Sequence, residues 1–193
     1  ITSSQTGVTP TVRSVSVAYA DMRQPLGGDS APLLPSWARD LQVPQISQAV
    51  QDPSIRWQIC SPTSLTMVLK YWGVDRSLLE VVEGVRDQTT GIYGNWPLNA
   101  AYAAIQGFDA YITRFHAVEQ LQNEIAQGRP VIVSINFKPG QLDNSPLAST
   151  SGHLIVVRGF AANGDVIVND PAAPSHGSVR RVYKRDQFTR VWL

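Results

Sequence analysis

The sequence predicts an α+β domain in which a helical half precedes an antiparallel sheet half. Three observations lead to this prediction. Apolar residues recur at helical spacing in segments between residues 62 and 127. Two apolar runs rich in β-branched residues follow, at residues 130–137 and 153–160. Asn163-Gly164, a pair typical of hairpin turns, comes soon after the second run. Helices first and paired strands afterwards favour a helical layer packed on a sheet.

Composition excludes some classes of function. The chain has 193 residues, of which 43% are hydrophobic and 16% charged, with a formal net charge of +1. A charge so close to zero gives no basis for predicting a nucleic-acid or membrane-surface partner. No apolar run approaches the ~20 residues that a membrane span needs. We therefore expect a domain with a sizeable core and a polar but weakly charged surface.

Residues 1–36 differ from the rest of the chain. Val12, Val15 and Val17 alternate with polar residues and predict an extended arm, and residues 23–36 are rich in proline and glycine, as linkers are. We expect 1–36 to be an arm and linker, the remnant of an upstream domain. Residues 37–193 then form the main domain.

The first predicted helix begins at Pro62, with Ser61 as its N-cap, and ends at Gly73. Its apolar positions are spaced three and four residues apart, so they share one face, on which we place Trp72 in the core. Three more helices are predicted at residues 75–83, 96–106 and 118–127, each followed by a glycine that ends it.

The strands follow the last of these helices. Residues 130–137 and 153–160 are predicted to be buried strands. A two-residue turn at Asn163-Gly164 would pair the second of them with residues 165–170 in antiparallel fashion. The alternating segment 178–183 predicts a further strand.

Cys60 is the only cysteine, so no disulfide can form within the chain. It stands just before the first predicted helix, where unsatisfied N–H groups and the helix dipole favour a thiolate. A histidine beside it would lower its pKa further. The alternative is that Cys60 is simply a small buried hydrophobe.

Three histidines could be the partner of this thiol. His153 opens the most apolar strand, at the end that faces the space between sheet and helices. His116 lies between a strand and a helix, where a surface turn is the better interpretation, and His176 lies in a proline-rich loop. His153 is therefore the candidate base, although a histidine at a strand start is more often a structural hydrogen-bonder.

An imidazole that acts as a base needs a third group to orient it. Asp170 ends the segment that pairs with the His153 strand, at the same edge of the sheet. Asn169 is the rival, and alternation along a strand places the two on opposite faces, so only one can serve. The alternative for both is an ordinary strand-ending turn.

Taken together, five segments resemble the papain-clan cysteine peptidases related to the bacteriocin-processing, double-glycine leader peptidases, the peptidase family thirty-nine-like group. In chain order they are VPQISQ (43–48), CSPTSLTMVLKYWG (60–73), GRPVIVSI (128–135), SGHLIVVRGF (151–160) and DVIVNDPA (165–172). The resemblance implies a papain-like fold over residues 41–193.

The resemblance also implies roles for individual residues. Cys60 matches the nucleophile, His153 the general base and acid, and Asp170 the orienting residue. Gln48 matches the oxyanion donor, with Gln58 as the alternative, and the backbone N–H of Cys60 would be the second donor. Many relatives have glycine directly after the cysteine, where this chain has Ser61.

These inferences predict a cysteine peptidase or amidase that forms a thioester acyl-enzyme on a peptide or protein substrate, with no metal or organic cofactor. Trp57, Tyr93 and Trp96 are candidate substrate-binding residues in a cleft. Two alternatives are open: an acyltransferase with the same triad, and a non-catalytic binding module of the same fold. The family and the weakly charged surface favour a secreted or cell-envelope bacterial protein.

Overall fold

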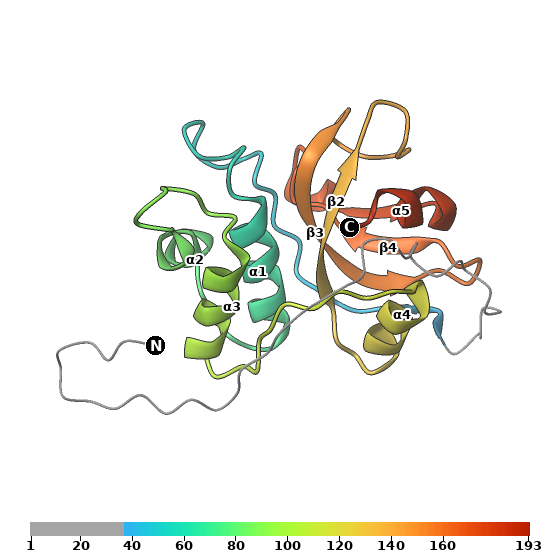
Figure 1. Cartoon of the computed structure of the whole chain (residues 1–193), viewed down its shortest axis with the longest axis horizontal. Coiled ribbons are helices and arrows are strands. Elements are labelled where there is room, and N and C mark those ends of the chain that lie inside the picture. Colours follow the sequence, from blue (N-terminus) through green and yellow to red (C-terminus); the bar gives the residue numbers. More distant parts are fainter. Residues whose placement is uncertain (1–36) are drawn as a thin grey trace.

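The computed structural model describes residues 37–193, and the predicted arm and linker at residues 1–36 lie outside the described residues. Helices α1 (Cys60–Tyr71), α2 (Leu78–Val85) and α3 (Trp96–Ile105) form one half of the molecule (Figure 1). An antiparallel sheet, with α4 (Val118–Ala126) and α5 (Arg185–Val191) against it, forms the other half. The predicted α+β class, with helices first and antiparallel strands second, is confirmed.

Helix α1 begins two residues earlier than predicted, at Cys60 itself. Its N-cap is Ile59, and no side chain caps it, so the prediction of Ser61 as the N-cap is wrong. Ser61 lies inside the first turn and its hydroxyl donates to Asn99 Oδ1 at 3.0 Å. Pro62 lies in the same turn, as predicted, because a helix leaves its first N–H groups without an intrahelical acceptor.

The other two helices of this half differ slightly from expectation. Helix α2 starts after Ser77, which forms a capping box with Glu80, rather than at Asp75. Gly84 does not end α2 but lies within it. A Cβ there would stand 2.1 Å from the Tyr102 ring, so this glycine lets α2 and α3 pack closely. Helix α3 starts and ends within one residue of its prediction, as α4 does.

The sheet is built on one long strand, β3 (Thr150–Phe160), which starts three residues before its prediction. Strand β2 (Val131–Phe137) pairs with one edge of β3, and β4 (Val166–Asn169) pairs with the other. Strand β5 (Arg180–Tyr183) pairs with β4. The β3–β4 connection is longer than the predicted two-residue turn, because β3 ends at Phe160 and β4 begins at Val166.

Three elements have no counterpart in the predictions, and the shortest helix among them is the 3-10 helix η2 (His176–Ser178). The two-residue strand β1 (Arg39–Asp40) pairs with the end of β3 opposite Gly159. A Cβ at Gly159 would lie 2.0 Å from the Arg39 carbonyl oxygen, so only glycine permits this approach. Helix α5 follows β5 and delivers Phe188 and Trp192 to the sheet core.

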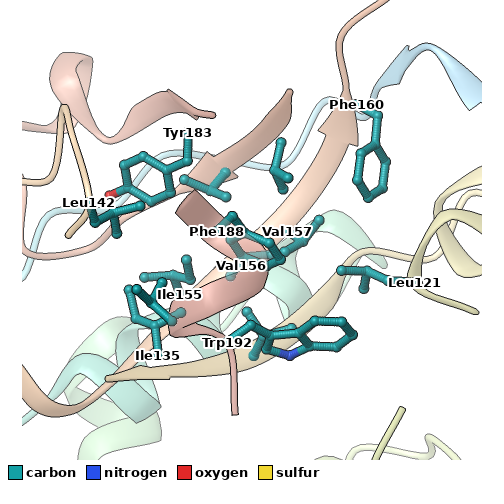
Figure 2. Packing of buried hydrophobic residues seen from close by; sticks show 14 of the residues in the cluster. Leu121, Ile135, Leu142, Ile155, Val156, Val157, Phe160, Tyr183, Phe188 and Trp192 are labelled. Atoms are coloured by element: carbon teal, nitrogen blue, oxygen red, sulfur yellow. The ribbon is translucent and has the colours of Figure 1, made fainter. Parts of the chain in front are cut away.

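The core has a large part on the sheet and a smaller part between the first three helices. Figure 2 shows Ile155 and Val157 of β3 with Phe188 and Trp192, and all four are buried. Burying such a side chain contributes roughly 1.5–3 kcal/mol. Within residues 37–193, no helix is long and apolar enough to cross a membrane.

Helix α1 belongs to both parts of the core. Met67 packs in the sheet core, while Leu65 and Leu69 pack against α2 and α3. Trp72 was expected in the core but is 46% exposed, just past the end of the helix. Because α1 is packed on two sides, its first residue, Cys60, is held in a fixed position against the sheet.

Candidate active site

Cys60 is the first residue of α1 and is partly buried. The backbone N–H groups of Ser61, in the first turn of the helix, and of Leu154, on β3, both act to lower the pKa of its thiol. One turn further along α1, the Ser64 hydroxyl donates to the Leu154 carbonyl oxygen at 3.1 Å. These contacts join the thiol-bearing end of α1 to the strand that carries His153.

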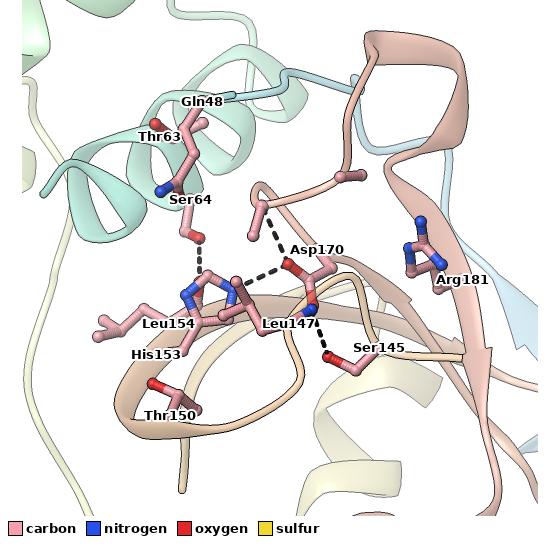
Figure 3. A network of polar contacts seen from close by, with 12 residues as sticks. Gln48, Thr63, Ser64, Ser145, Leu147, Thr150, His153, Leu154, Asp170 and Arg181 are labelled. Carbon is pink, nitrogen blue, oxygen red and sulfur yellow. Dashed lines mark hydrogen bonds and ion pairs between the residues drawn. The ribbon is translucent and has the colours of Figure 1, made fainter. Parts of the chain in front are cut away.

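His153 lies on β3 and is only 3% exposed. Its Nε2 atom lies 2.8 Å from Asp170 Oδ1 (Figure 3). The Cys60 thiol lies close enough to the ring to raise the pKa of His153. Because Nε2 is taken by Asp170, Nδ1 is the nitrogen left for the sulfur. The structure thus brings Cys60, His153 and Asp170 into one continuous chain of side-chain contacts.

Strand register explains why Asp170, rather than Asn169, meets the histidine. Strands β3 and β4 pair Val156 with Asn169, so Asp170 stands beside Ile155, on the same face as His153. Diagonal neighbours on one face lie within reach of long side chains. Asn169 points the other way, and its amide donates to the Pro44 carbonyl oxygen at 2.9 Å.

The Asp170 carboxylate is completely buried and has three hydrogen-bond donors. Besides His153, the Tyr183 hydroxyl donates to its Oδ2 at 2.6 Å, and the Ala172 N–H donates to its Oδ1 at 3.0 Å. Burial alone would raise the pKa of Asp170, but the charge of His153 and these hydrogen bonds hold the pKa below its ordinary value. Asp170 is therefore ionised at neutral pH.

The thiol and the imidazole favour an ion pair. Burial alone would raise the pKa of the Cys60 thiol, but the hydrogen bond and charge of His153 lower it below its ordinary value. Burial would likewise lower the pKa of His153, but Asp170 and the Cys60 thiol raise it to about 10. Both shifts favour a thiolate beside an imidazolium, and the thiolate is the reactive form of cysteine.

Tyr183 is a site residue that sequence reasoning missed. It ends β5 and is fully buried. The signal was present, because a tyrosine at the end of an apolar strand needs a hydrogen-bond partner for its hydroxyl when it is buried. Nothing in the pattern of β5 alone, however, says that this partner is Asp170.

The two glutamines proposed for the oxyanion site lie in different environments. Gln48 is buried, and its Nε2 donates to the Arg56 carbonyl oxygen at 2.7 Å. An amide nitrogen carries two N–H groups, so one of them stays available. Gln58 is exposed, and its Nε2 donates to the Ser54 carbonyl oxygen at 3.1 Å, within its own loop. The structure thus buries Gln48 and turns Gln58 toward its own loop.

The aromatic residues proposed to bind substrate are spread over three places. Trp96 lines a mainly apolar pocket of about 230 Å³, whose wall also includes Ser61 and Leu154, the neighbours of Cys60 and His153. Trp57 lines a separate open depression. Tyr93 is buried among Ile59, Leu78 and Val82 and lines neither hollow. Of the three, only Trp96 therefore lines the pocket whose wall includes the neighbours of Cys60 and His153.

The other two histidines lie elsewhere. His116 is exposed just before α4. His176 is also exposed, and its Nδ1 accepts a hydrogen bond from the Ser47 N–H at 3.0 Å. In the described part of the chain, no group of three or more His, Cys, Asp or Glu side chains is arranged to hold a metal ion.

Comparisons with known proteins address the family of the chain. No curated protein matches it. A solved structure that is similar to it is a double glycine motif protease from an AMS/PCAT transporter in complex with the leader peptide. The two chains are 17% identical over 79% of this chain and 87% of that one, with a TM-score of 0.45. The family described as Peptidase C39 like matches residues 40–193. Because this match covers well over half of the sequence, the chain belongs to the peptidase C39-like family, as its motifs predicted.

Proposed function

We propose that this protein is a cysteine peptidase or amidase that cleaves a peptide or amide bond through a thioester acyl-enzyme. The observation that carries the proposal is the buried chain of contacts from Cys60 through His153 to Asp170, with 2.8 Å between the last two. Membership of a peptidase family supports the same reaction class. A purely structural role for the buried Asp170 would not explain why the histidine that it binds also lies against the Cys60 thiol.

In the first half of the proposed reaction, the Cys60 thiolate attacks the carbonyl carbon of the substrate, and a sulfur–carbon bond forms. The carbonyl oxygen becomes an oxyanion, for which Gln48 Nε2 and the backbone N–H of Cys60 are the donors. As the first residue of α1, Cys60 has no intrahelical acceptor for that N–H. The carbon–nitrogen bond then breaks, and His153 gives its proton to the departing amine.

In the second half, a water molecule attacks the thioester. His153, now neutral, takes one proton from the water, and the sulfur–carbon bond breaks to release a carboxylic acid. The thiolate and imidazolium are restored. Throughout the cycle Asp170 stays ionised, fixes the ring orientation and stabilises the imidazolium.

The apolar pocket supports a peptide substrate. Leu65, Trp96 and Phe115 are among its lining residues, and its wall includes Ser61, which directly follows Cys60. Pockets of this kind take an apolar side chain and hold the bond to be broken in place. Binding there would bring the carbonyl carbon to Cys60.

The test is digestion of a mixed peptide library, read by mass spectrometry. The parent protein is expected to produce new termini, and Cys60→Ser is expected to produce none. Treatment with iodoacetamide is a second control, because Cys60 is the only thiol to modify. Cleavage that persists in Cys60→Ser with the folded state intact by circular dichroism would refute the proposal.

A further inference from the structure

The open depression that Trp57 lines carries two arginines, Arg56 and Arg181, and no acidic residue among its lining side chains. Its remaining walls are made mostly of small or apolar residues, such as Ala172 and Pro146. Several arginines elsewhere in residues 37–193 are paired with carboxylates. Arg158 and Arg180, for example, both bind Asp40. The two arginines of the depression differ from these in having no carboxylate partner.

Arg56 presents a guanidinium with no partner of its own. Its Nε–H group is buried and has no hydrogen-bond acceptor. Within residues 37–193, no hydrogen bond or ion pair of this guanidinium is found. Its position is set by the neighbouring Trp57, because the guanidinium carbon lies 5.5 Å from the centroid of the indole ring. A cation held in this way is positioned before any ligand arrives.

The Arg181 guanidinium is hydrogen-bonded through one nitrogen, while its other edge has no acceptor. Its Nη1 donates to the Asn144 carbonyl oxygen at 2.7 Å and to Asn144 Oδ1 at 3.2 Å. Its Nε is buried without an acceptor, and in the described part of the chain the guanidinium makes no ion pair. The bonds to Asn144 therefore leave the Nε–Nη2 edge free. That edge has the two parallel N–H groups that match a carboxylate.

The depression adjoins the candidate active site through three of its residues. The backbone N–H of Ala172 donates a hydrogen bond to the Asp170 carboxylate. The backbone carbonyl oxygen of Arg56 accepts a hydrogen bond from the side-chain amide of Gln48. Ala49 directly follows Gln48. Figure 3 shows Arg181 on the side of Asp170 away from His153. The apolar pocket instead borders the site at Ser61 and Leu154, so the two hollows meet the site through different residues.

We infer that this depression binds a carboxylate of the substrate close to the bond that is cleaved, with Arg56 and Arg181 as its ligands. The inference rests on the proposed hydrolytic function, for which it names a feature of the substrate. Charge-assisted hydrogen bonds from arginine to carboxylate are among the strongest in proteins. The carboxylate comes from an acidic side chain or from the C-terminus of a peptide.

The first experiment is peptide-library digestion by the parent, Arg56→Gln, Arg181→Gln and the matched control Arg76→Gln. Arg76 is exposed at α2 and pairs with Glu80, so its replacement removes the same charge far from the depression. The parent is expected to favour Asp or Glu, or a free C-terminus, at one position near the cleaved bond. Defined peptides with Glu or Gln there, and with a free acid or amide terminus, distinguish the two sources.

The parent should cleave the peptide with the preferred carboxylate with a kcat/KM about tenfold or more above its kcat/KM for the neutral peptide. This preference should be lost in Arg56→Gln and Arg181→Gln and retained in Arg76→Gln. Cleavage with no preference for a carboxylate, or a preference unchanged in both variants, would overturn the inference while leaving the hydrolytic function in place.

A second experiment does not need hydrolysis. Iodoacetate and iodoacetamide alkylate Cys60 with similar shape, but only iodoacetate carries a carboxylate. The ratio of their rate constants is expected to fall roughly twofold to fivefold in Arg56→Gln and in Arg181→Gln, less so at high salt, and to stay unchanged in Arg76→Gln. If the library is not cleaved, this ratio still tests the anion site. Equal ratios in all four proteins would overturn it.

Discussion

Replacing Asp170 with asparagine keeps the size of the side chain and removes its charge, which makes it a direct perturbation of the His153 imidazole. In the parent, Asp170, at 2.8 Å, and the Cys60 thiol together raise the pKa of His153 to about 10 against the effect of burial. A hydrogen bond to a charged group contributes about 1.5–3 kcal/mol. One pKa unit corresponds to about 1.4 kcal/mol. Asp170→Asn should therefore lower the pKa of His153 by roughly one to two units.

The assay is NMR titration of the imidazole C–H signals. The chain has three histidines, so the spectrum is simple, and His116 and His176 serve as internal references. The control is Asp186→Asn, which removes an exposed carboxylate bonded to Arg190. A His153 titration that is the same in Asp170→Asn as in the parent would refute the assignment of Asp170 as the orienting residue.

The same change has a consequence for stability. The pKa of His153 is raised above its ordinary value of 6.5, so the stabilisation that its charge contributes is complete below pH 6.5. That stabilisation is lost as pH rises through the folded-state pKa of about 10. The difference in free energy of unfolding between parent and Asp170→Asn should thus be largest just below pH 6.5 and should narrow as pH rises toward 10. Urea denaturation at several pH values measures it.

Two further substitutions test the surroundings of the triad. Tyr183→Phe removes the 2.6 Å hydrogen bond to the buried Asp170, and should lower the free energy of unfolding in urea by about 1.5–3 kcal/mol, whereas Tyr111→Phe, at an exposed tyrosine, should change it little. An equal effect of the two tyrosine changes would contradict the role given to this bond. Gln48→Ala should slow peptide cleavage about 10²–10³-fold with little effect on alkylation of the thiol, whereas Gln58→Ala should leave cleavage unchanged. The reverse order of the two glutamines would assign the oxyanion donor to Gln58.

Periodicity and turn chemistry predicted most elements of the fold because they are local properties. The apolar run rich in β-branched residues at 130–137 predicted β2, and glycines at 107 and 128, both with positive φ, follow α3 and α4 as expected. Predictions failed where contacts between distant segments determine the local structure, as at the start of α1. Ser61 has the chemistry of an N-cap, but Asn99 from α3 binds its hydroxyl within the helix.

The candidate site was predictable to the extent that strand register follows from alternation. His153 and Asp170 could be placed at one sheet edge from the hairpin signal, and they lie in contact. Tyr183 could not be placed, because its bond to Asp170 depends on how β5 pairs with β4. The two arginines of the depression come from a loop and a strand 125 residues apart, so no local pattern brings Arg56 and Arg181 together.

The central claim is that His153 holds Cys60 as a thiolate, and the rate of iodoacetamide labelling as a function of pH tests it most directly. The helix dipole contributes about 0.3–1 kcal/mol, which lowers the pKa of a thiol by less than one unit. Any further lowering of the Cys60 pKa must come from the His153 imidazolium. His153→Ala should therefore move the labelling curve to higher pH and slow labelling near pH 6 by roughly tenfold or more. Superimposable curves for the parent and His153→Ala would contradict the account.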